Sequence, residues 1–260
     1  MDKRSPIAVI DSGVGGISVL RELVRLMPNE DFRYFGDSAN APYGEKSTEA
    51  VRALTLSHAT RLFSEGAKAL VVACNTATGA AIAALREAFP DRVVIGIEPA
   101  LKPAARSKTS PSVLVMATPL TLKQEKFEHL LAQYNEDARI TVLPCHGLVE
   151  LIEQGIVDGE RLTAHLQKLF APLAGVSPDA VVLGCTHYPL VRDAIQTVVG
   201  KNVPLFDGGV GTAKETRRRL EEAGLLNDTD RTGTVTFENS ASSPALLTLC
   251  RDLLYEEVAT

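Results

Sequence analysis

Residues 71–76 read VVACNT, and a similar stretch, VVLGCTH, occupies residues 181–187. In each, a short apolar, β-branched run leads into a cysteine and then into polar side chains, where a helix-period segment begins. Unbroken apolar runs of this kind are typical of parallel strands buried on both faces. The two stretches therefore predict two buried strands that each end at a cysteine.

A second pair of stretches repeats this pattern. IAVIDS at residues 7–12 resembles VLVMAT at residues 113–118, and the two pairs keep the same order and nearly the same spacing along the chain. Self-similarity of this kind indicates a duplicated structural unit. We expect two related halves.

Short apolar runs alternate with helix-period segments through most of the chain, which indicates an α/β fold with mainly parallel sheets flanked by helices. We expect strands near residues 7–10, 32–35, 69–73, 93–97, 113–117, 140–143, 180–184 and 203–206. Thr121 with Gln124 and Thr212 with Glu215 fit the capping box at a helix start. Cys250, on the apolar face of the last helix, is interpreted as a core residue.

Composition excludes several classes of protein. The 260 residues are 45% hydrophobic and 23% charged, as in a globular protein. A net charge of −5, no Trp and 5% aromatic residues argue against a nucleic-acid partner. No apolar run approaches the roughly 20 residues that span a membrane, and the start of the chain lacks the apolar core of a signal peptide. We expect a cytoplasmic protein with no membrane partner, whose four cysteines are free thiols.

Polar side chains follow four of the expected strands. These residues are Asp11, Ser12, Cys74, Asn75, Thr76, Thr118, Cys185, Thr186 and His187. In open parallel sheets the ligand cleft forms beyond the carboxyl ends of the strands. Helix starts at the same edge offer free N–H groups to carboxylates. The pattern predicts one site at this edge.

A cysteine at a helix start has its thiol pKa lowered toward neutrality, which makes it a usable base or nucleophile. His187 can relay the proton of Cys185, and Asp11 is the corresponding polar candidate beside Cys74. The alternative is that each cysteine is a small buried hydrophobe. We favour an acid/base or nucleophilic role because both cysteines occur in matching contexts with polar neighbours. His58, on the apolar face of a helix, is interpreted as a satisfied core residue.

Metal and nucleotide sites are less well supported. Cys145 and His146 together with Cys185 and His187 offer four soft ligands, but no zinc-site spacing accompanies them, so we expect no metal. The glycine-rich residues 13–16 follow a strand but lack the G-x-G-x-x-G spacing of a dinucleotide site. We interpret them as a tight turn that permits close backbone approach.

Four motifs together resemble those of bacterial glutamate racemases, in the cofactor-independent aspartate/glutamate racemase superfamily. They are DSGVGG at residues 11–16, PYG at 42–44, ACNTA at 73–77 and GCTHYPL at 184–190. The resemblance runs from about residue 7 to at least residue 211. It implies two pseudo-symmetric α/β lobes with the active site in the cleft between them. We place the first lobe at residues 1–98 plus 209–260 and the second at 99–208.

The resemblance also implies roles for individual residues. Cys74 and Cys185 would be the acid/base thiols, assisted by Asp11 and His187 respectively, and Glu153 matches an acidic position near the histidine. The substrate would be held by Asp11, Ser12, Tyr43, Gly44, Asn75, Thr76, Thr118, Thr186 and His187. Where many members have Asp-Ser, this chain has Asp207-Gly208, so we expect no substrate hydroxyl there.

The implied activity is the interconversion of L- and D-glutamate for peptidoglycan synthesis, without a cofactor, by a homodimer. One alternative is a racemase for aspartate or another amino acid. Another is a two-lobed binding protein in which the cysteines are incidental. A thiol-redox function is disfavoured because no resolving cysteine lies near either thiol in the sequence.

Overall fold

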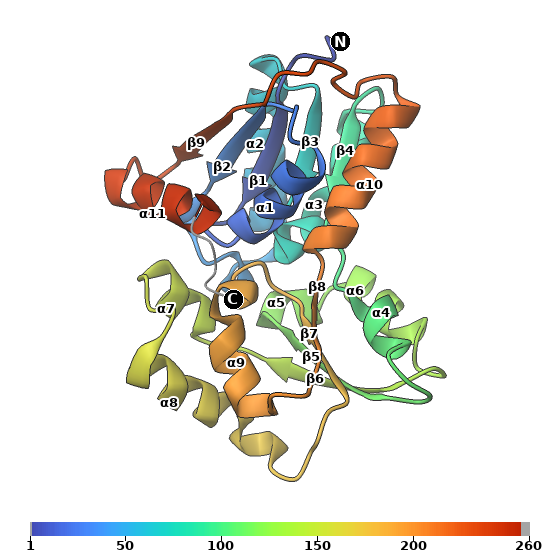
Figure 1. The fold of residues 1–260 in the computed structure, drawn as a ribbon, viewed down its shortest axis with the longest axis vertical. Helices are drawn as coiled ribbons and strands as arrows, with labels where there is room; N and C mark the ends of the chain where they lie inside the picture. The colour runs from blue at the N-terminus through green and yellow to red at the C-terminus, as the bar shows by residue number, and fades with distance from the viewer. Residues whose placement is uncertain (1, 256–260) are drawn as a thin grey trace.

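Two parallel sheets organise the computed structural model, which describes residues 2–255 (Figure 1). The strands are β1 (Ile7–Asp11), β2 (Phe32–Gly36), β3 (Ala69–Val72), β4 (Val93–Gly96), β5 (Ser112–Ala117), β6 (Arg139–Pro144), β7 (Ala180–Leu183), β8 (Leu205–Asp207) and β9 (Val235–Asn239). The predicted α/β class is confirmed, and the eight expected strands lie within two residues of their predicted bounds.

The two sheets repeat one strand order. The first sheet runs β4-β3-β1-β2-β9 and the second runs β8-β7-β5-β6, with every neighbouring pair parallel. β5 therefore takes the place of β1, and β7 the place of β3. These are the two pairs of stretches whose sequences resemble each other, so the expected pseudo-symmetry is confirmed.

Helices cover both faces of each sheet. They are α1 (Ile17–Leu26), α2 (Thr48–Ser64), α3 (Asn75–Ala88), α4 (Leu101–Ala105), α5 (Pro119–Leu122), α6 (Glu125–Ala132), α7 (Leu148–Glu153), α8 (Gly159–Phe170), α9 (Arg192–Val199), α10 (Gly209–Glu222) and α11 (Pro244–Tyr255). Helices α1, α10 and α11 pack on one face of the first sheet, and α2 and α3 on the other. In the second sheet α7, α8 and α9 oppose α4 and α6.

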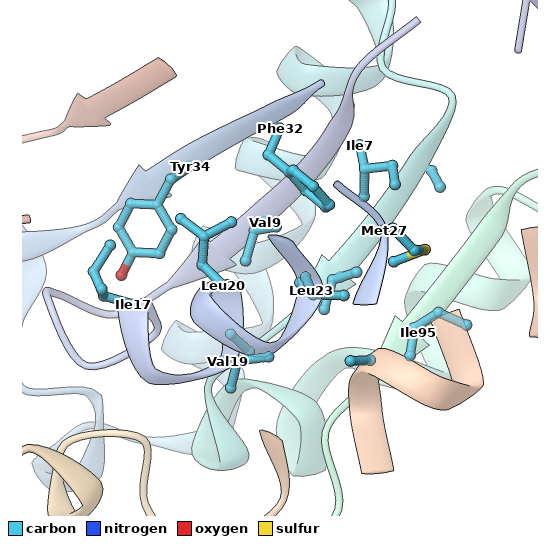
Figure 2. Close-up of a cluster of buried hydrophobic side chains, with 14 of the residues drawn as sticks. Ile7, Val9, Ile17, Val19, Leu20, Leu23, Met27, Phe32, Tyr34 and Ile95 are labelled. Atoms are coloured by element: carbon cyan, nitrogen blue, oxygen red, sulfur yellow. The ribbon is translucent and has the colours of Figure 1, made fainter. Parts of the chain in front are cut away.

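The apolar runs are explained by this two-sided burial. Along β1, Ile7 and Val9 face α1, as Figure 2 shows, while Ala8 and Ile10 face α2 and α3. Successive side chains of a strand point to opposite faces, so a strand covered on both sides needs apolar residues at every position. All five residues of β1 are buried.

Two connections join the lobes, and Gly208 lies where they pass each other. A side chain at Gly208 would place its Cβ 2.5 Å from the carbonyl oxygen of Glu98, so the two chain segments touch backbone to backbone. Gly208 also caps the N-terminus of α10. Glycine at this position is therefore explained by close packing of the two connections.

Three expectations were wrong or incomplete. Thr118, not Thr121, caps α5, and Gly208, not Thr212, precedes α10, so neither predicted capping box forms. β9, an edge strand beside β2, was not expected, because its half-exposed residues alternate in polarity and so form no continuous apolar run. The burial of Cys250 in the core is confirmed. Among residues 2–255 there is no helix with both the length and the apolar character needed to span a membrane.

Candidate active site

The expected polar residues gather where the carboxyl ends of the two sheets face each other. Asp11 ends β1, and Cys74 follows β3 as the residue that caps α3. In the other lobe, Thr118 follows β5 as the cap of α5, and Cys185 follows β7 closely. The cysteines are 5% and 7% exposed, so both thiols lie inside the closed molecule.

Cys74 occupies a helix start, as expected, but its pKa is not lowered. Its sulfur accepts a hydrogen bond from the backbone N–H of Ala77 at 3.5 Å, and its thiol donates to the Ser12 hydroxyl at 3.7 Å. Burial raises the pKa of the Cys74 thiol to about 12, and the charge of Asp11 acts in the same direction. The expected lowering is therefore wrong, because desolvation outweighs the helix start. Cys74 is a protonated thiol at neutral pH.

Cys185 has a different environment, because a histidine and a glutamate stand behind it. His187 Nδ1 lies 3.7 Å from the Cys185 sulfur, and His187 Nε2 lies 2.6 Å from Glu153 Oε1. Burial lowers the pKa of His187, but the hydrogen bonds with Cys185 and Glu153 outweigh it and raise the pKa above its ordinary value. A protonated imidazole therefore stands beside this sulfur.

Glu153, which the sequence only weakly indicated, contacts both the expected site residue His187 and the opposite lobe. Burial raises its pKa, but the hydrogen bond from His187 outweighs burial, so the pKa is lowered and the carboxylate is ionised. The same carboxylate accepts the backbone N–H of Val14, from the other lobe, at 2.8 Å. Glu153 thus holds the imidazolium and joins the lobes at once.

The glycine-rich turn at residues 13–16 is explained by its contacts with Glu153 and His187. A Cβ at Gly13 would lie 1.8 Å from Glu153 Oε1, and one at Gly15 would lie 2.3 Å from His187 Nδ1. Close backbone approach was expected here, but the partner was not. The turn is glycine-rich because side chains of the second lobe pack directly on it.

Asp11 connects the lobes on the side of Cys74. Its carboxylate accepts hydrogen bonds from the Thr186 hydroxyl at 3.0 Å and from the Gly13 N–H at 3.0 Å. Burial raises the pKa of Asp11, and the two hydrogen bonds only partly oppose this. Because Thr186 adjoins Cys185, Asp11 reaches from one cysteine to the neighbour of the other.

Three hydroxyls form a second connection between the lobes. Thr76 Oγ1 lies 3.0 Å from Thr118 Oγ1 and 3.0 Å from Thr121 Oγ1. The Gln124 side-chain amide donates to the Thr76 carbonyl at 2.9 Å. Beside them, the buried Oδ1 of Asn75 has no hydrogen-bond partner within the described chain. An unpaired buried acceptor is suited to a ligand's N–H donor.

The side chain of Tyr43 is fixed by a hydrogen bond within its own lobe. Its hydroxyl donates to Asp37 at 2.6 Å, inside the first lobe, so this hydroxyl is already bonded. Gly44 lies against the second lobe, where a Cβ would come within 2.8 Å of Thr118 Cβ. At Gly44, therefore, it is the backbone of residues 42–44 that packs against the second lobe.

The site is closed. A cavity lined by Cys185, Thr186 and Asn75 has a volume of about 10 Å³, which is room for about one water molecule. The space beside Cys185 is too small for an amino acid, which can occupy it only if the surrounding residues move. A larger cavity, of about 410 Å³, is lined by Asn75 together with Thr121 and Gln124.

The soft residues weighed as metal ligands do not converge. Cys145 is buried and its thiol donates to the Leu143 carbonyl at 3.4 Å, whereas the side chain of His146 is 65% exposed and lies 3.5 Å from Glu45. Nowhere in residues 2–255 do three or more His, Cys, Asp or Glu side chains gather as a metal site.

Two parallel-sheet lobes that each bring one buried cysteine toward the other suit an isomerase of the racemase class, which needs an acid and a base on opposite faces of one carbon. A model of the Asp/Glu/Hydantoin racemase family matches residues 7–216, and the chain belongs to that family.

Relatives match along nearly the whole chain. A glutamate racemase from Clostridium botulinum is 48% identical over 255 residues, covering 98% of this chain and 99% of that protein. The structure of Francisella tularensis glutamate racemase in complex with D-glutamate matches with a TM-score of 0.84 at 28% identity, covering 99% and 96% of the two chains. The structure of Escherichia coli glutamate racemase in complex with L-glutamate and an activator, UDP-MurNAc-ala, matches with a TM-score of 0.85 at 32% sequence identity. The match covers 96% of this chain and 95% of that one.

Proposed function

We propose that this protein interconverts L-glutamate and D-glutamate by moving the α-proton between Cys74 and Cys185, without a cofactor. The observation that carries the proposal is that two buried thiols, one from each lobe, are close enough to interact electrostatically, with Asp11 near Cys74 and His187 beside Cys185. The substrate is proposed as glutamate because the relatives that cover nearly all of the chain are glutamate racemases.

The reaction needs a base and an acid on opposite sides of one carbon. With L-glutamate, Cys185 as thiolate takes the α-proton, and the protonated thiol of Cys74 gives its proton to the opposite face. Cys185 then carries one proton and Cys74 is left as thiolate, which is the arrangement that starts the reverse reaction on D-glutamate. Two chemically similar groups suit a reaction that runs both ways.

The charges around the two sulfurs fit the first of these directions. Burial raises the pKa of Cys74 to about 12, so it holds a proton. The protonated His187, held by Glu153, stands beside Cys185, and a neighbouring positive charge stabilises a thiolate. Cys185 is therefore proposed as the base toward L-glutamate and Cys74 as the base toward D-glutamate.

The difficult step places negative charge on a carbon next to a carboxylate. We propose that N–H groups and hydroxyls at the helix starts, including Ser12, Asn75, Thr76, Thr118 and Thr186, stabilise that charge and hold the substrate's ionic groups. A closed site free of bulk water strengthens each of these contacts.

The remaining expectations are proposals of the same kind. We place the lobe boundaries at residues 98 and 208, and we propose a cytoplasmic homodimer that binds neither nucleic acid nor membrane. Its product would supply D-glutamate for peptidoglycan.

The test is incubation of the purified protein with L-glutamate and, separately, L-aspartate in D₂O without added cofactor. We expect loss of optical rotation and of the α-proton signal with glutamate alone. Activity on aspartate alone would instead indicate the aspartate alternative, and no change with either would favour a binding protein. Cys74→Ala should abolish the activity, whereas Cys250→Ala, a buried cysteine in the core of the first lobe, should keep it.

A further inference from the structure

Asp37 lies directly after β2, at the base of the segment formed by residues 37–46, and its carboxylate is the centre of a hydrogen-bond cluster. Tyr43 donates its hydroxyl to Asp37 Oδ2 at 2.6 Å, and Asn40 donates its amide at 3.0 and 3.2 Å to the two oxygens. His58 Nε2 lies 3.0 Å from the same Oδ2. We call residues 37–46 the PYG loop.

The carboxylate is ionised although it is fully buried. Burial raises the pKa of Asp37, but hydrogen bonds from His58, Ser240, Tyr43 and Asn40 outweigh this and lower the pKa to about 2. A buried charge is stable only while its hydrogen-bond donors stay in place. Each of these donors therefore helps to hold the loop in one conformation.

His58 differs from Tyr43 and Asn40 because it lies outside the loop. It belongs to α2, and its ring packs on Phe35 with a centroid distance of 4.6 Å. Helix α2 packs on α3, the helix that Cys74 caps. The bond from His58 to Asp37 thus ties the PYG loop to the helix pair that carries one of the proposed catalytic thiols.

The far side of the loop reaches the second lobe. Gly44 packs so closely on Thr118 that a Cβ would come within 2.8 Å of its side chain. Ser38, in the same loop, donates to Glu153 at 3.4 Å. The loop therefore forms part of the wall of the site, and its placement affects how a substrate is held.

We propose that His58 is a positioning residue, which fixes the PYG loop against the substrate through the buried carboxylate of Asp37. The effect on substrate binding rests on the proposed function, whereas the effect on the loop does not. His58 touches neither thiol and takes no part in proton transfer.

The test compares three variants. His58→Phe keeps a ring against Phe35 but removes the donor, and His58→Gln restores an N–H near the position of Nε2. His165→Phe is the matched control, since His165 lies in α8 and its Nε2 bonds the His146 carbonyl at 2.9 Å. Two readouts are needed, amide hydrogen exchange across residues 38–46 and the kinetics of glutamate racemisation in both directions.

In His58→Phe we expect exchange in the PYG loop to be roughly tenfold faster, because a hydrogen bond to a charged group is lost. The KM for both enantiomers should rise by roughly the same factor, with kcat changed by less than about threefold. His58→Gln should restore both quantities. His165→Phe should match the wild type in both.

Unchanged amide hydrogen exchange across residues 38–46 in His58→Phe overturns the inference. A fall in kcat at unchanged KM also overturns it, because that result indicates a general structural defect and not a loss of loop positioning. If His58→Phe does not fold, Tyr43→Phe removes another donor to the same carboxylate and must give the same changes in exchange and KM. A wild-type protein that does not act on glutamate refutes the proposed function alone, because the exchange measurement still decides the role of His58.

Discussion

Cys74 and Cys185 are alike in sequence context but not in surroundings. The charge nearest Cys74 is the carboxylate of Asp11, whereas Cys185 stands beside the imidazolium of His187. Nearby negative charge favours a protonated thiol and nearby positive charge favours a thiolate. This asymmetry of charge around the two sulfurs is what the proposed acid and base roles rest on.

The hydrogen bond from Thr186 to Asp11 joins the two halves of the site and can be tested by substitution. Replacing Thr186 by Val removes the hydroxyl that donates to Asp11 at 3.0 Å and leaves that buried carboxylate with one donor fewer. We expect Thr186→Val to fold but to lose about 10²-fold in kcat/KM, measured with either enantiomer. Thr186→Ser keeps the hydroxyl and should stay close to wild type. Near-wild-type rates for Thr186→Val would remove Thr186 from the site.

For single residues, the sequence predicts which side chains lie at the site, but it predicts their pKa values and hydrogen-bond partners less well. A cysteine after an apolar strand places Cys74 and Cys185 correctly, because strand ends fix their positions. It does not reveal the pKa of Cys74, which depends on burial by segments distant in sequence. The apolar face of its helix indicates that His58 is a satisfied core residue, but the sequence does not reveal its partner, Asp37, which lies outside that helix.

Among the elements, the turn between β1 and α1 carries the strictest packing requirement. Gly15→Ala would place a Cβ 2.3 Å from His187 Nδ1, so the imidazole must move away from Cys185. We expect kcat to fall by about 10²-fold, the effect of misplacing a catalytic group by roughly 1 Å.

Gly211→Ala is the control for this prediction. A Cβ at Gly211, in α10, meets nothing within 4 Å. That variant should keep full activity and gain about 0.5–1 kcal/mol in the free energy of unfolding, measured by urea denaturation, because Ala is the better helix former. A Gly15→Ala protein as active as Gly211→Ala would contradict the packing that we describe.

Most strands could be predicted from the sequence, including β4, β6 and β8 at sheet edges, whereas the edge strand β9 could not. Continuous apolar runs identified β1, β3, β5 and β7 because each lies inside a covered sheet. β9 gains its stability from pairing with β2 and from α11, which its own residues do not disclose. Thr118 caps α5 although the capping-box spacing indicated Thr121.

For the molecule as a whole, the buried cysteines predict loss of stability at alkaline pH. Burial raises the pKa of Cys74, Cys145 and Cys250 from 9.0 to about 12. Between these values the unfolded chain loses the protons that the folded chain keeps. Stability is therefore full below pH 9 and falls as the pH rises toward 12, by up to about 1.4 kcal/mol per pH unit for each thiol.

Urea denaturation at a series of pH values from 8 to 11 checks this prediction. The fall in the free energy of unfolding should be less steep in a Cys145→Ala, Cys250→Ala double variant, which retains only the thiols near the proposed site. An equal slope in the double variant and the wild type would show that these thiols are not buried as described.

The paired lobes could be inferred from repeated strands, but their closure could not. The bonds of Glu153 to Val14 and of Asp11 to Thr186 each join residues from different lobes. No local pattern encodes them. In this closed form only about 10 Å³ of space lies beside Cys185.

The most direct test of the central claim, one thiol on each side of the substrate's α-carbon, is the fate of the α-hydrogen early in a reaction of L-glutamate in D₂O. We expect the first D-glutamate formed to carry deuterium from the solvent while the remaining L-glutamate keeps its protium. Product that retains the original protium, or L-glutamate that gains deuterium as fast as D-glutamate appears, would mean that a single group acts on both faces.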